Sequence, residues 1–146
     1  MQIKIYTFGR IKNPEIKQLQ QYYIRLVQKY FRVEMIELKD IADRRVSLKE
    51  VSLYLLPKQK NIFLSDDGVG MNTFHFLNFF KKMQIQTKVL CFFIGNAFGF
   101  DAEVKKRADM LLSFSSMTFP HEFVKILLLE QIFRIGNLWQ GGDYHK

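Results

Sequence analysis

The hydrophobic positions of the first forty residues follow the two-residue period of a strand, then the period of a helix, and then the strand period again. Residues 2–8 alternate in side-chain character as a strand does, and Gly9 ends this run. Residues 14–30 then repeat apolar side chains at helical spacing, and residues 33–38 alternate again. The pattern therefore predicts a strand, a helix and a second strand.

Turn and cap signals place the first helix boundaries. The triplet Asn13–Glu15, with proline in its centre, is typical of a helix start. Ser47 and Glu50 have the spacing of a capping box, which predicts a second helix ending near Leu56, before Pro57.

The rest of the chain repeats one pattern of strand, loop and helix. The expected strands are residues 61–65, 88–94 and 110–114, and the expected helices are residues 73–83, 101–108 and 122–138. The run 88–94 is continuously apolar, as expected of a strand covered on both faces. Five strands alternating with five helices predict one α/β domain over residues 1–146, with a mostly parallel sheet and helices on both faces.

Three loops follow the late strands: Leu64–Gly70, Gly95–Phe100 and Ser115–His121. Two of them hold paired glycines, which let backbone approach a ligand closely. Ligands of open α/β sheets lie beyond the carboxyl ends of strands, so we expect one pocket built from these loops. An ordinary strand-to-helix connection is the alternative for the last loop.

Helix-start signals are dense in the last loop. Pro120 suits a first helical turn, and Ser116 or Thr118 can cap it. His121 follows directly and is expected near the pocket mouth. The sequence between Gly95 and Gly99 lacks the Gly-Lys-Ser/Thr of a phosphate-binding loop, which argues against a nucleoside triphosphatase.

The aromatic content of these loops suits an adenosine-type ligand. Phe98, Phe100 and Phe119 can flank a flat ring, although a core role is the alternative for each. Cys91 is expected to be buried and His75 to lie on the surface. A single cysteine excludes an internal disulfide, and no metal site is expected.

Charge changes the picture further. The net charge is +8, and residues 1–60 hold 13 Lys and Arg against 6 Asp and Glu, which gives +7. Residues 61–146 hold 9 against 8, which gives +1. This asymmetry predicts a surface that faces a polyanion, with nucleic acid ahead of a membrane. Charge for solubility is the alternative. No apolar run is long enough to span a bilayer. The single cysteine is consistent with a reducing cytosol, so a cytoplasmic protein is expected.

The final helix is apolar nearly all round, with Lys125, Glu130 and Arg134 as its later charged residues. Such a helix needs cover on more than one side, so we expect a homodimer. Glu130 and Arg134 have the spacing of an ion pair. The tail, Tyr144–Lys146, has the chemistry to stack on a base and hold a phosphate, or it is simply a flexible end.

Several segments resemble the ribosomal RNA large subunit methyltransferase H family of the SPOUT class. They are Leu90–Gly99, Leu111–His121, the Glu130-x-x-Phe-Arg134 motif and Tyr144–Lys146, and the resemblance spans the whole chain. It implies a homodimer with a C-terminal trefoil knot that binds S-adenosylmethionine. The implied reaction methylates N3 of a pseudouridine in 23S rRNA of the ribosome.

The resemblance also implies site residues. Cofactor contacts are expected at Leu64, Gly95, Asn96, Gly99, Ser115, Ser116, Met117, Thr118, Phe119 and Pro120. Candidate catalytic residues are His121, Glu130, Arg134 and His145, of which His121, Glu130 and His145 are unranked as proton acceptors. RNA contacts are expected at Arg10, Arg44, Arg45, Lys125, Tyr144 and Lys146.

The chain departs from the family's pattern at several points. Asn96 stands where a glycine is usual, and Lys125 where an arginine is common. The segment around residues 40–49 looks shortened. Knot and tail are expected to come from different subunits, which makes each active site composite. A non-catalytic RNA-binding module of the same fold is the alternative, favoured by Asn96, and a flavodoxin-like protein is a third reading.

Overall fold

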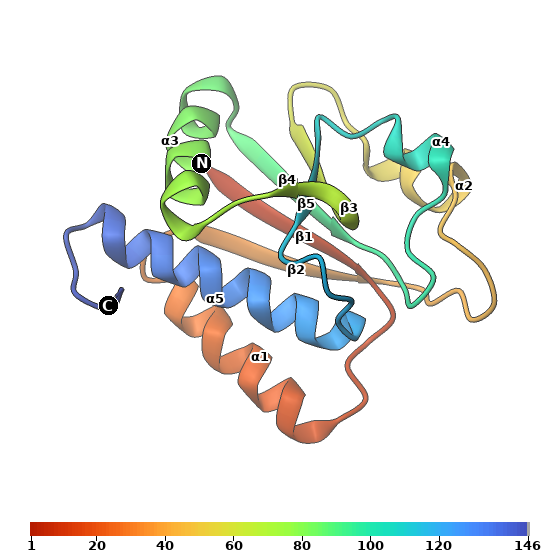
Figure 1. Cartoon of the computed structure of the whole chain (residues 1–146), viewed down its shortest axis with the longest axis horizontal. Coiled ribbons are helices and arrows are strands. Elements are labelled where there is room, and N and C mark those ends of the chain that lie inside the picture. The colour runs from red at the N-terminus through yellow and green to blue at the C-terminus, as the bar shows by residue number, and fades with distance from the viewer. Residues whose placement is uncertain (146) are drawn as a thin grey trace.

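Residues 1–145, which the computed structural model describes, form one sheet of five parallel strands. The order across the sheet is β2-β1-β4-β3-β5 (Figure 1). The strands are β1 (Gln2–Phe8), β2 (Arg32–Leu38), β3 (Lys60–Gly70), β4 (Val89–Ile94) and β5 (Met110–Ser113). The parallel α/β fold expected from the sequence is confirmed.

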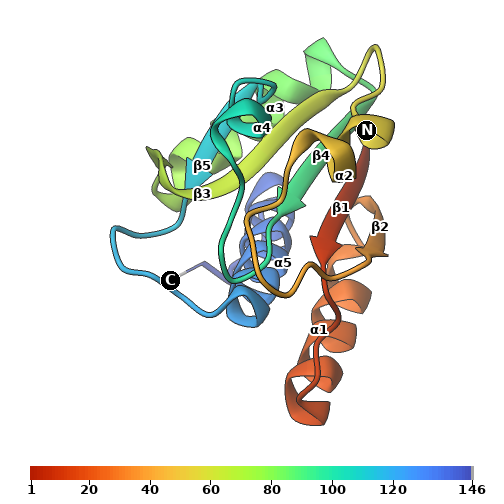
Figure 2. The ribbon, with the colours of Figure 1, turned by 90° about the vertical axis from the view of Figure 1, so that its right-hand side faces the viewer.

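Helices cover both faces of this sheet (Figure 2). They are α1 (Pro14–Val27), α2 (Leu48–Val51), α3 (Thr73–Gln86), α4 (Ala102–Lys105) and α5 (His121–Trp139), with a 3₁₀ turn, η1 (Ser52–Tyr54), after α2. Helices α1, α3 and α5 pack on the face that holds Ile5 and Phe92. Helices α2 and α4 pack on the opposite face, which holds Tyr6 and Phe93. Alternate strand residues thus fill two separate cores.

The helix starts follow the cap signals. The Asn13 side chain accepts hydrogen bonds from the backbone N–H groups of Glu15 and Ile16 at 2.8 and 3.2 Å. The Ser47 backbone N–H donates to the Glu50 carboxylate at 2.9 Å, as expected of the capping box. Two of the predicted helices therefore begin where the sequence places them.

The start of α5 differs from the prediction. Pro120 precedes the helix as its N-cap residue, and no side chain caps this end. The expected caps from Ser116 and Thr118 are therefore wrong. The Ser115 hydroxyl instead accepts from the Met117 backbone N–H at 2.9 Å, which closes a turn within the loop.

Strand β3 is longer than expected. Residues 66–70 read as a loop, yet β3 continues to Gly70 and pairs with β5 a second time. The register shifts between Leu64 and Val69, and both residues pair with Leu112. A Cβ atom at Gly68 would lie 2.7 Å from backbone atoms of β5, so only glycine allows this close passage.

Helix α5 is covered within its own chain. It packs between α1 and α3 against the sheet, and Leu128, Ile132 and Ile135 are fully buried. The apolar character of α5 is therefore explained without a second copy. The first turn of α5 lies at the edge where the strands end (Figure 1), so β4, β3 and β5 direct their loops toward it.

Candidate active site

One cleft lies at the carboxyl ends of β4, β3 and β5. It has a volume of about 220 Å³ and opens to solvent on one side. Its wall includes Leu64–Asp66, residues 94–100, residues 112–115 and residues 117–119, together with His121 and Val124 of α5. The loops expected after β4 and β5 therefore meet at one place with residues 64–66, which belong to β3 rather than to a loop.

Most of the residues expected to contact a cofactor line this cleft. They are Leu64, Gly95, Asn96, Gly99, Ser115, Met117, Thr118 and Phe119. Ser116, inside the turn that Ser115 closes, and Pro120 are not part of the cleft wall.

Two glycines keep the loop between β4 and α4 compact. Gly99 has a φ of +72°, a conformation that L side chains rarely adopt. A Cβ atom at Gly95 would lie 3.1 Å from the Gly99 Cα, so the two turns of this loop touch through bare backbone. Both positions expose backbone toward the cleft.

Aromatic side chains divide between cleft and core. Phe98 and Phe119 line the cleft and are 53% and 40% exposed. Phe100 also touches the cleft, but its ring is buried and packs edge-on against Phe8 and Phe63. Phe114 also lines the cleft and is partly buried, so Phe98 and Phe119 are the most exposed aromatic side chains available to a flat ligand there.

His121 is the candidate catalytic residue that lies in the cleft wall. Burial lowers the pKa of its imidazole below 6.5, and the nearby charge of Lys125 lowers this pKa further. The imidazole is therefore mostly neutral at pH 7, the form that accepts a proton.

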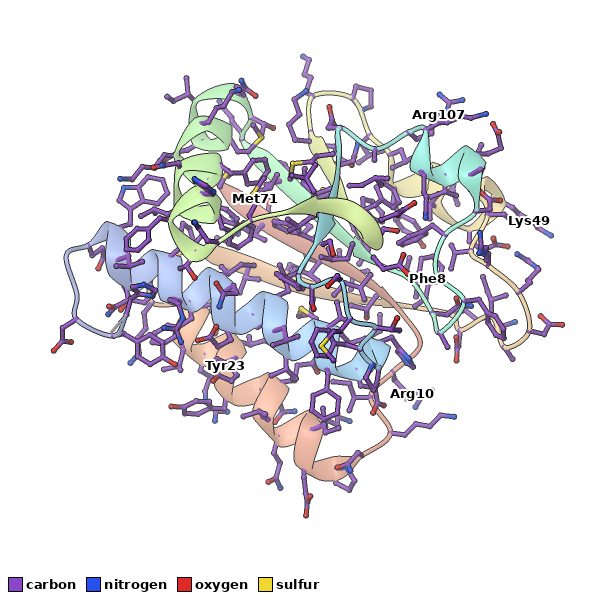
Figure 3. The ribbon with its side chains drawn as sticks, in the orientation of Figure 1. Phe8, Arg10, Tyr23, Lys49, Met71 and Arg107 are labelled. Carbon is purple, nitrogen blue, oxygen red and sulfur yellow. The ribbon has the colours of Figure 1, made fainter. Side chains whose placement is uncertain are left out.

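Lys125 does not face solvent, which corrects its expected role as an RNA contact. It is 1% exposed, and its ammonium donates to the Gly9 carbonyl at 2.6 Å. Burial lowers the pKa of Lys125. One turn earlier on α5, the Glu122 carboxylate accepts from the Lys12 backbone N–H at 2.7 Å. Both contacts fix the loop between β1 and α1, which carries Arg10 beside the start of α5 (Figure 3).

The charged residues of the cleft wall are Arg45, Asp66 and Lys105. Lys105 comes from α4, outside the three segments expected to form the pocket, so the sequence analysis did not identify it as a residue of the site. Its ammonium contacts both carboxylate oxygens of Asp67 at 2.9 Å. Arg44, by contrast, turns away from the cleft wall and pairs with Glu50 at 2.8 Å.

The remaining candidate residues gather toward the other end of α5. The Arg134 guanidinium donates to Glu130 through Nε at 2.9 Å and Nη2 at 2.5 Å. This bonding raises the pKa of Arg134. The Tyr144 ring lies 4.8 Å from the Arg134 guanidinium carbon, and the imidazole of His145 lies 3.4 Å from its Nη1. We call Glu130, Arg134, Tyr144 and His145 the tail cluster.

One protomer does not bring the tail cluster to the cleft. His121 and Glu130 are nine positions apart on one straight helix, which corresponds to about 13 Å along its axis. Tyr23 of α1 (Figure 3) lies near Tyr144 and Glu130, so the tail cluster lies beside this part of α1. Lys146 lies outside the described residues.

Within residues 1–145, no three His, Cys, Asp or Glu side chains gather as metal ligands. None of the helices in this part of the chain has the length and apolar character needed to cross a bilayer.

Comparisons with known proteins agree with this geometry. Residues 1–145 match the family model described as "Predicted SPOUT methyltransferase". The solved structure of a tRNA (m1G37) methyltransferase from Aquifex aeolicus superposes with a TM-score of 0.58 over 92% of this chain and 70% of that chain. At 16% identity, this likeness shows the fold alone.

Full-length relatives carry one name, "Ribosomal RNA large subunit methyltransferase H". The relative from Clostridioides difficile is 35% identical, with all of both chains covered. That from Thermodesulfovibrio yellowstonii is 36% identical over 97% of each chain. That from Malacoplasma penetrans is 32% identical over all of both chains.

Proposed function

The chain belongs to the ribosomal RNA large subunit methyltransferase H family of SPOUT methyltransferases, and from this premise we propose its substrate, donor and mechanism. The proposed reaction transfers the methyl group of S-adenosylmethionine to N3 of a pseudouridine in 23S rRNA, on the ribosome in the cytoplasm. The observation that carries the proposal is that residues 64–66 of β3 and the loops after β4 and β5 line one cleft.

The cleft suits the adenosyl part of this donor. Phe98 and Phe119 offer apolar contact to an adenine ring, and the absence of side chains at Gly95 and Gly99 leaves room for a ligand beside the backbone. The loop from Ser115 to Phe119 supplies the third wall. When bound, S-adenosylmethionine supplies a methyl group that is already activated for transfer, so the protein mainly aligns the reactants.

The cleft of one protomer covers such a ligand only in part. Its volume of about 220 Å³ is below the range of roughly 300–1,000 Å³ that is usual for small-molecule sites. Met117 and Phe119 remain 73% and 40% exposed at its rim. Apolar rims of this kind suit cover by a second protein surface.

His121 is the best-placed proton acceptor for the imide N3–H of the base. It lines the cleft, and its lowered pKa keeps it neutral at pH 7. Glu130 is less suited, because Arg134 and Gln131 already donate to its carboxylate. We therefore rank His121 above Glu130.

Arg134 is suited to holding RNA rather than to moving a proton. Its contacts with Glu130 fix the guanidinium, while Tyr144 stacks beside it. A fixed guanidinium next to an aromatic ring is a chemistry that binds nucleotides well. A homodimer in which the tail cluster of one subunit faces the cleft of the other would complete each site. The C-terminal trefoil knot that the family resemblance implies stays a prediction.

Methylation of assembled ribosomes tests the proposal. The protein is incubated with S-adenosylmethionine and ribosomes that lack the modification, and the 23S rRNA is then mapped by mass spectrometry. One new methyl group on a single pseudouridine is expected, and the His121→Ala variant should slow its appearance by about 100-fold. Methyl groups found only on small molecules would defeat the rRNA assignment.

A further inference from the structure

The cleft wall carries an unpaired cation and an unpaired anion. Arg45 and Asp66 both line the cleft, and within residues 1–145 neither side chain has an ion pair or a hydrogen bond. Lys105 is occupied by Asp67, and His121 is mostly neutral at pH 7. Of the basic side chains in the described cleft wall, Arg45 is therefore the one free to bind an anion.

The backbone around Arg45 is held in place from both sides. On one side, the Asn96 amide nitrogen donates to the Arg44 carbonyl at 2.9 Å and to the Ile41 carbonyl at 2.5 Å. On the other side, Val46 forms a bridge with Phe100. The Val46 N–H donates to the Gly99 carbonyl at 2.9 Å, and the Val46 carbonyl accepts at 3.0 Å from the N–H of Asp101.

These contacts join the loop after β2 to the loop after β4. Asn96 is 7% exposed, and its side-chain oxygen accepts from the Phe98 N–H at 3.0 Å. One amide thus orders its own turn and anchors the neighbouring loop. The short segment between Ile41 and Val46 is fastened at both ends, with Arg45 between them at the cleft.

The donor has charges that match this pair. Its methionine part is a zwitterion, with a carboxylate and an ammonium on the same carbon. A guanidinium binds a carboxylate through paired, charge-assisted hydrogen bonds, and a carboxylate accepts from an ammonium. The adenosine carries no full charge, and the sulfonium is a cation, so the only anion of the donor that Arg45 can bind is the carboxylate of the amino-acid part. Asp66 can attract the sulfonium as well as the ammonium, but a probe without the sulfonium leaves only the ammonium.

We propose that Arg45 and Asp66 form a subsite for the amino-acid end of the donor, and that Asn96 is the positioning residue that holds Arg45 there. This inference rests on the proposed function, since it assigns a subsite within the same cleft. The Asn96 side chain then anchors the loop after β2, which a glycine at the same position cannot do. It fastens a short loop whose arginine binds the donor.

Two probes isolate this subsite. S-adenosylhomocysteine carries the amino-acid part, whereas 5′-methylthioadenosine keeps the adenosine and thioether without it. Calorimetric titration of the full chain gives an affinity for each probe. Arg45→Ala should weaken binding of S-adenosylhomocysteine by about 10-fold or more and leave 5′-methylthioadenosine unchanged. Arg107→Ala is the matched control, since Arg107 is exposed and lies outside the cleft wall, and it should change neither affinity.

Asn96→Ala tests the positioning role. It should reduce the preference for S-adenosylhomocysteine over 5′-methylthioadenosine, by a smaller factor than Arg45→Ala does. A purely structural effect would weaken both probes alike, and that result would overturn the role given to Asn96. Asp66→Asn should weaken S-adenosylhomocysteine several-fold through its ammonium.

Other outcomes separate this inference from the proposed function. If Arg45→Ala weakens both probes equally, or lowers affinity for ribosomes while S-adenosylhomocysteine binds as before, the subsite is wrong and the donor cleft stands. If the unmodified chain binds neither probe, the proposed function fails together with its subsite.

Discussion

Burial decides what two side chains near the start of α5 can do. His121 lines the cleft with a lowered pKa, whereas Lys125, one turn further on, is enclosed and bonded to the Gly9 carbonyl. Both looked similar in the sequence, as polar residues near a helix start. The difference arises because position 125 faces the end of β1 and position 121 faces the cleft.

The pH dependence of methyl transfer tests the role of His121. The neutral imidazole accepts the proton, so kcat/KM should fall as the pH drops through the pKa of His121, which lies below 6.5. In His121→Asn this acidic limb should disappear, and the rate at pH 7 should fall by about 100-fold. An unchanged acidic limb in the variant would exclude His121 as the base.

Stability at high pH tests the burial of Lys125. The folded pKa lies below the unfolded value of 10.5, so the folded state binds this proton less tightly. As the pH rises toward 10.5, the protein should therefore gain stability relative to the Lys125→Met variant. Urea unfolding of both proteins near pH 7 and near pH 10 measures the change. Lys49→Met, at an exposed lysine of α2 (Figure 3), is the control and should show no such trend. Equal differences at both pH values would contradict the prediction.

Single residues also show where sequence reasoning stopped. Gly95 and Gly99 were expected at the cleft because glycine allows close backbone approach, and Phe119 because of its aromatic ring and the family resemblance; all three line the cleft. In the sequence, Asn96 only favoured a non-catalytic module, because its partners, the carbonyls of Ile41 and Arg44, lie more than fifty positions away. Such partners are known only once the two loops are side by side.

At the scale of elements, strand and helix periods were sufficient for most of the fold. One exception is the helix expected to end near Leu56, which ends at Val51 as α2 and continues as the 3₁₀ turn η1 to Tyr54. The larger exception is β3, whose last residues, Asp66–Gly70, have the composition of a turn. Tertiary pairing with β5 overrides that local preference, because Val69 and Gly70 gain partners there. The local sequence carries little information about this second pairing of β3 with β5.

The close passage of β3 over β5 at Gly68 predicts that a larger residue at this position destabilises the protein. Gly68→Ala places a methyl group 2.7 Å from the backbone of Leu111 and Leu112, which cannot move without disturbing the sheet. We expect a loss of about 1–3 kcal/mol in the free energy of unfolding, measured by urea denaturation. Gly70→Ala is the control, since no atom lies within 4 Å of its Cβ position. Equal losses in the two variants would show that the crossing is not tightly packed.

At the scale of the whole molecule, the candidate catalytic residues lie in two places along α5. His121 is at the cleft, and the tail cluster is about 13 Å or more away along the helix axis. The sequence suggested a dimer because α5 is apolar, yet α1 and α3 already cover this helix. The stronger argument for a second copy is the incomplete cleft with its exposed rim.

A mixing experiment tests whether two chains complete one site. The His121→Ala variant and the Arg134→Ala variant should each be nearly inactive in methyl transfer to ribosomes. Refolding them together forms mixed dimers in which one of the two sites has both intact residues. About a quarter of the unmodified activity should return, as expected of random pairing in a two-fold dimer.

No recovery in the mixture, with mixed dimers confirmed by a size tag on one chain, would place the whole site within one protomer. A protein that remains monomeric in sedimentation at assay concentration would exclude the composite site altogether. Either result would leave the cleft of the single chain as the donor site.

Hydrogen exchange with and without S-adenosylhomocysteine tests the central claim most directly. The account predicts slower exchange in three separate segments: residues 64–66 within β3, residues 95–99 after β4 and residues 115–119 after β5. Protection confined to one of these segments, or found instead at the opposite end of the sheet around Tyr30 and Trp139, would contradict it.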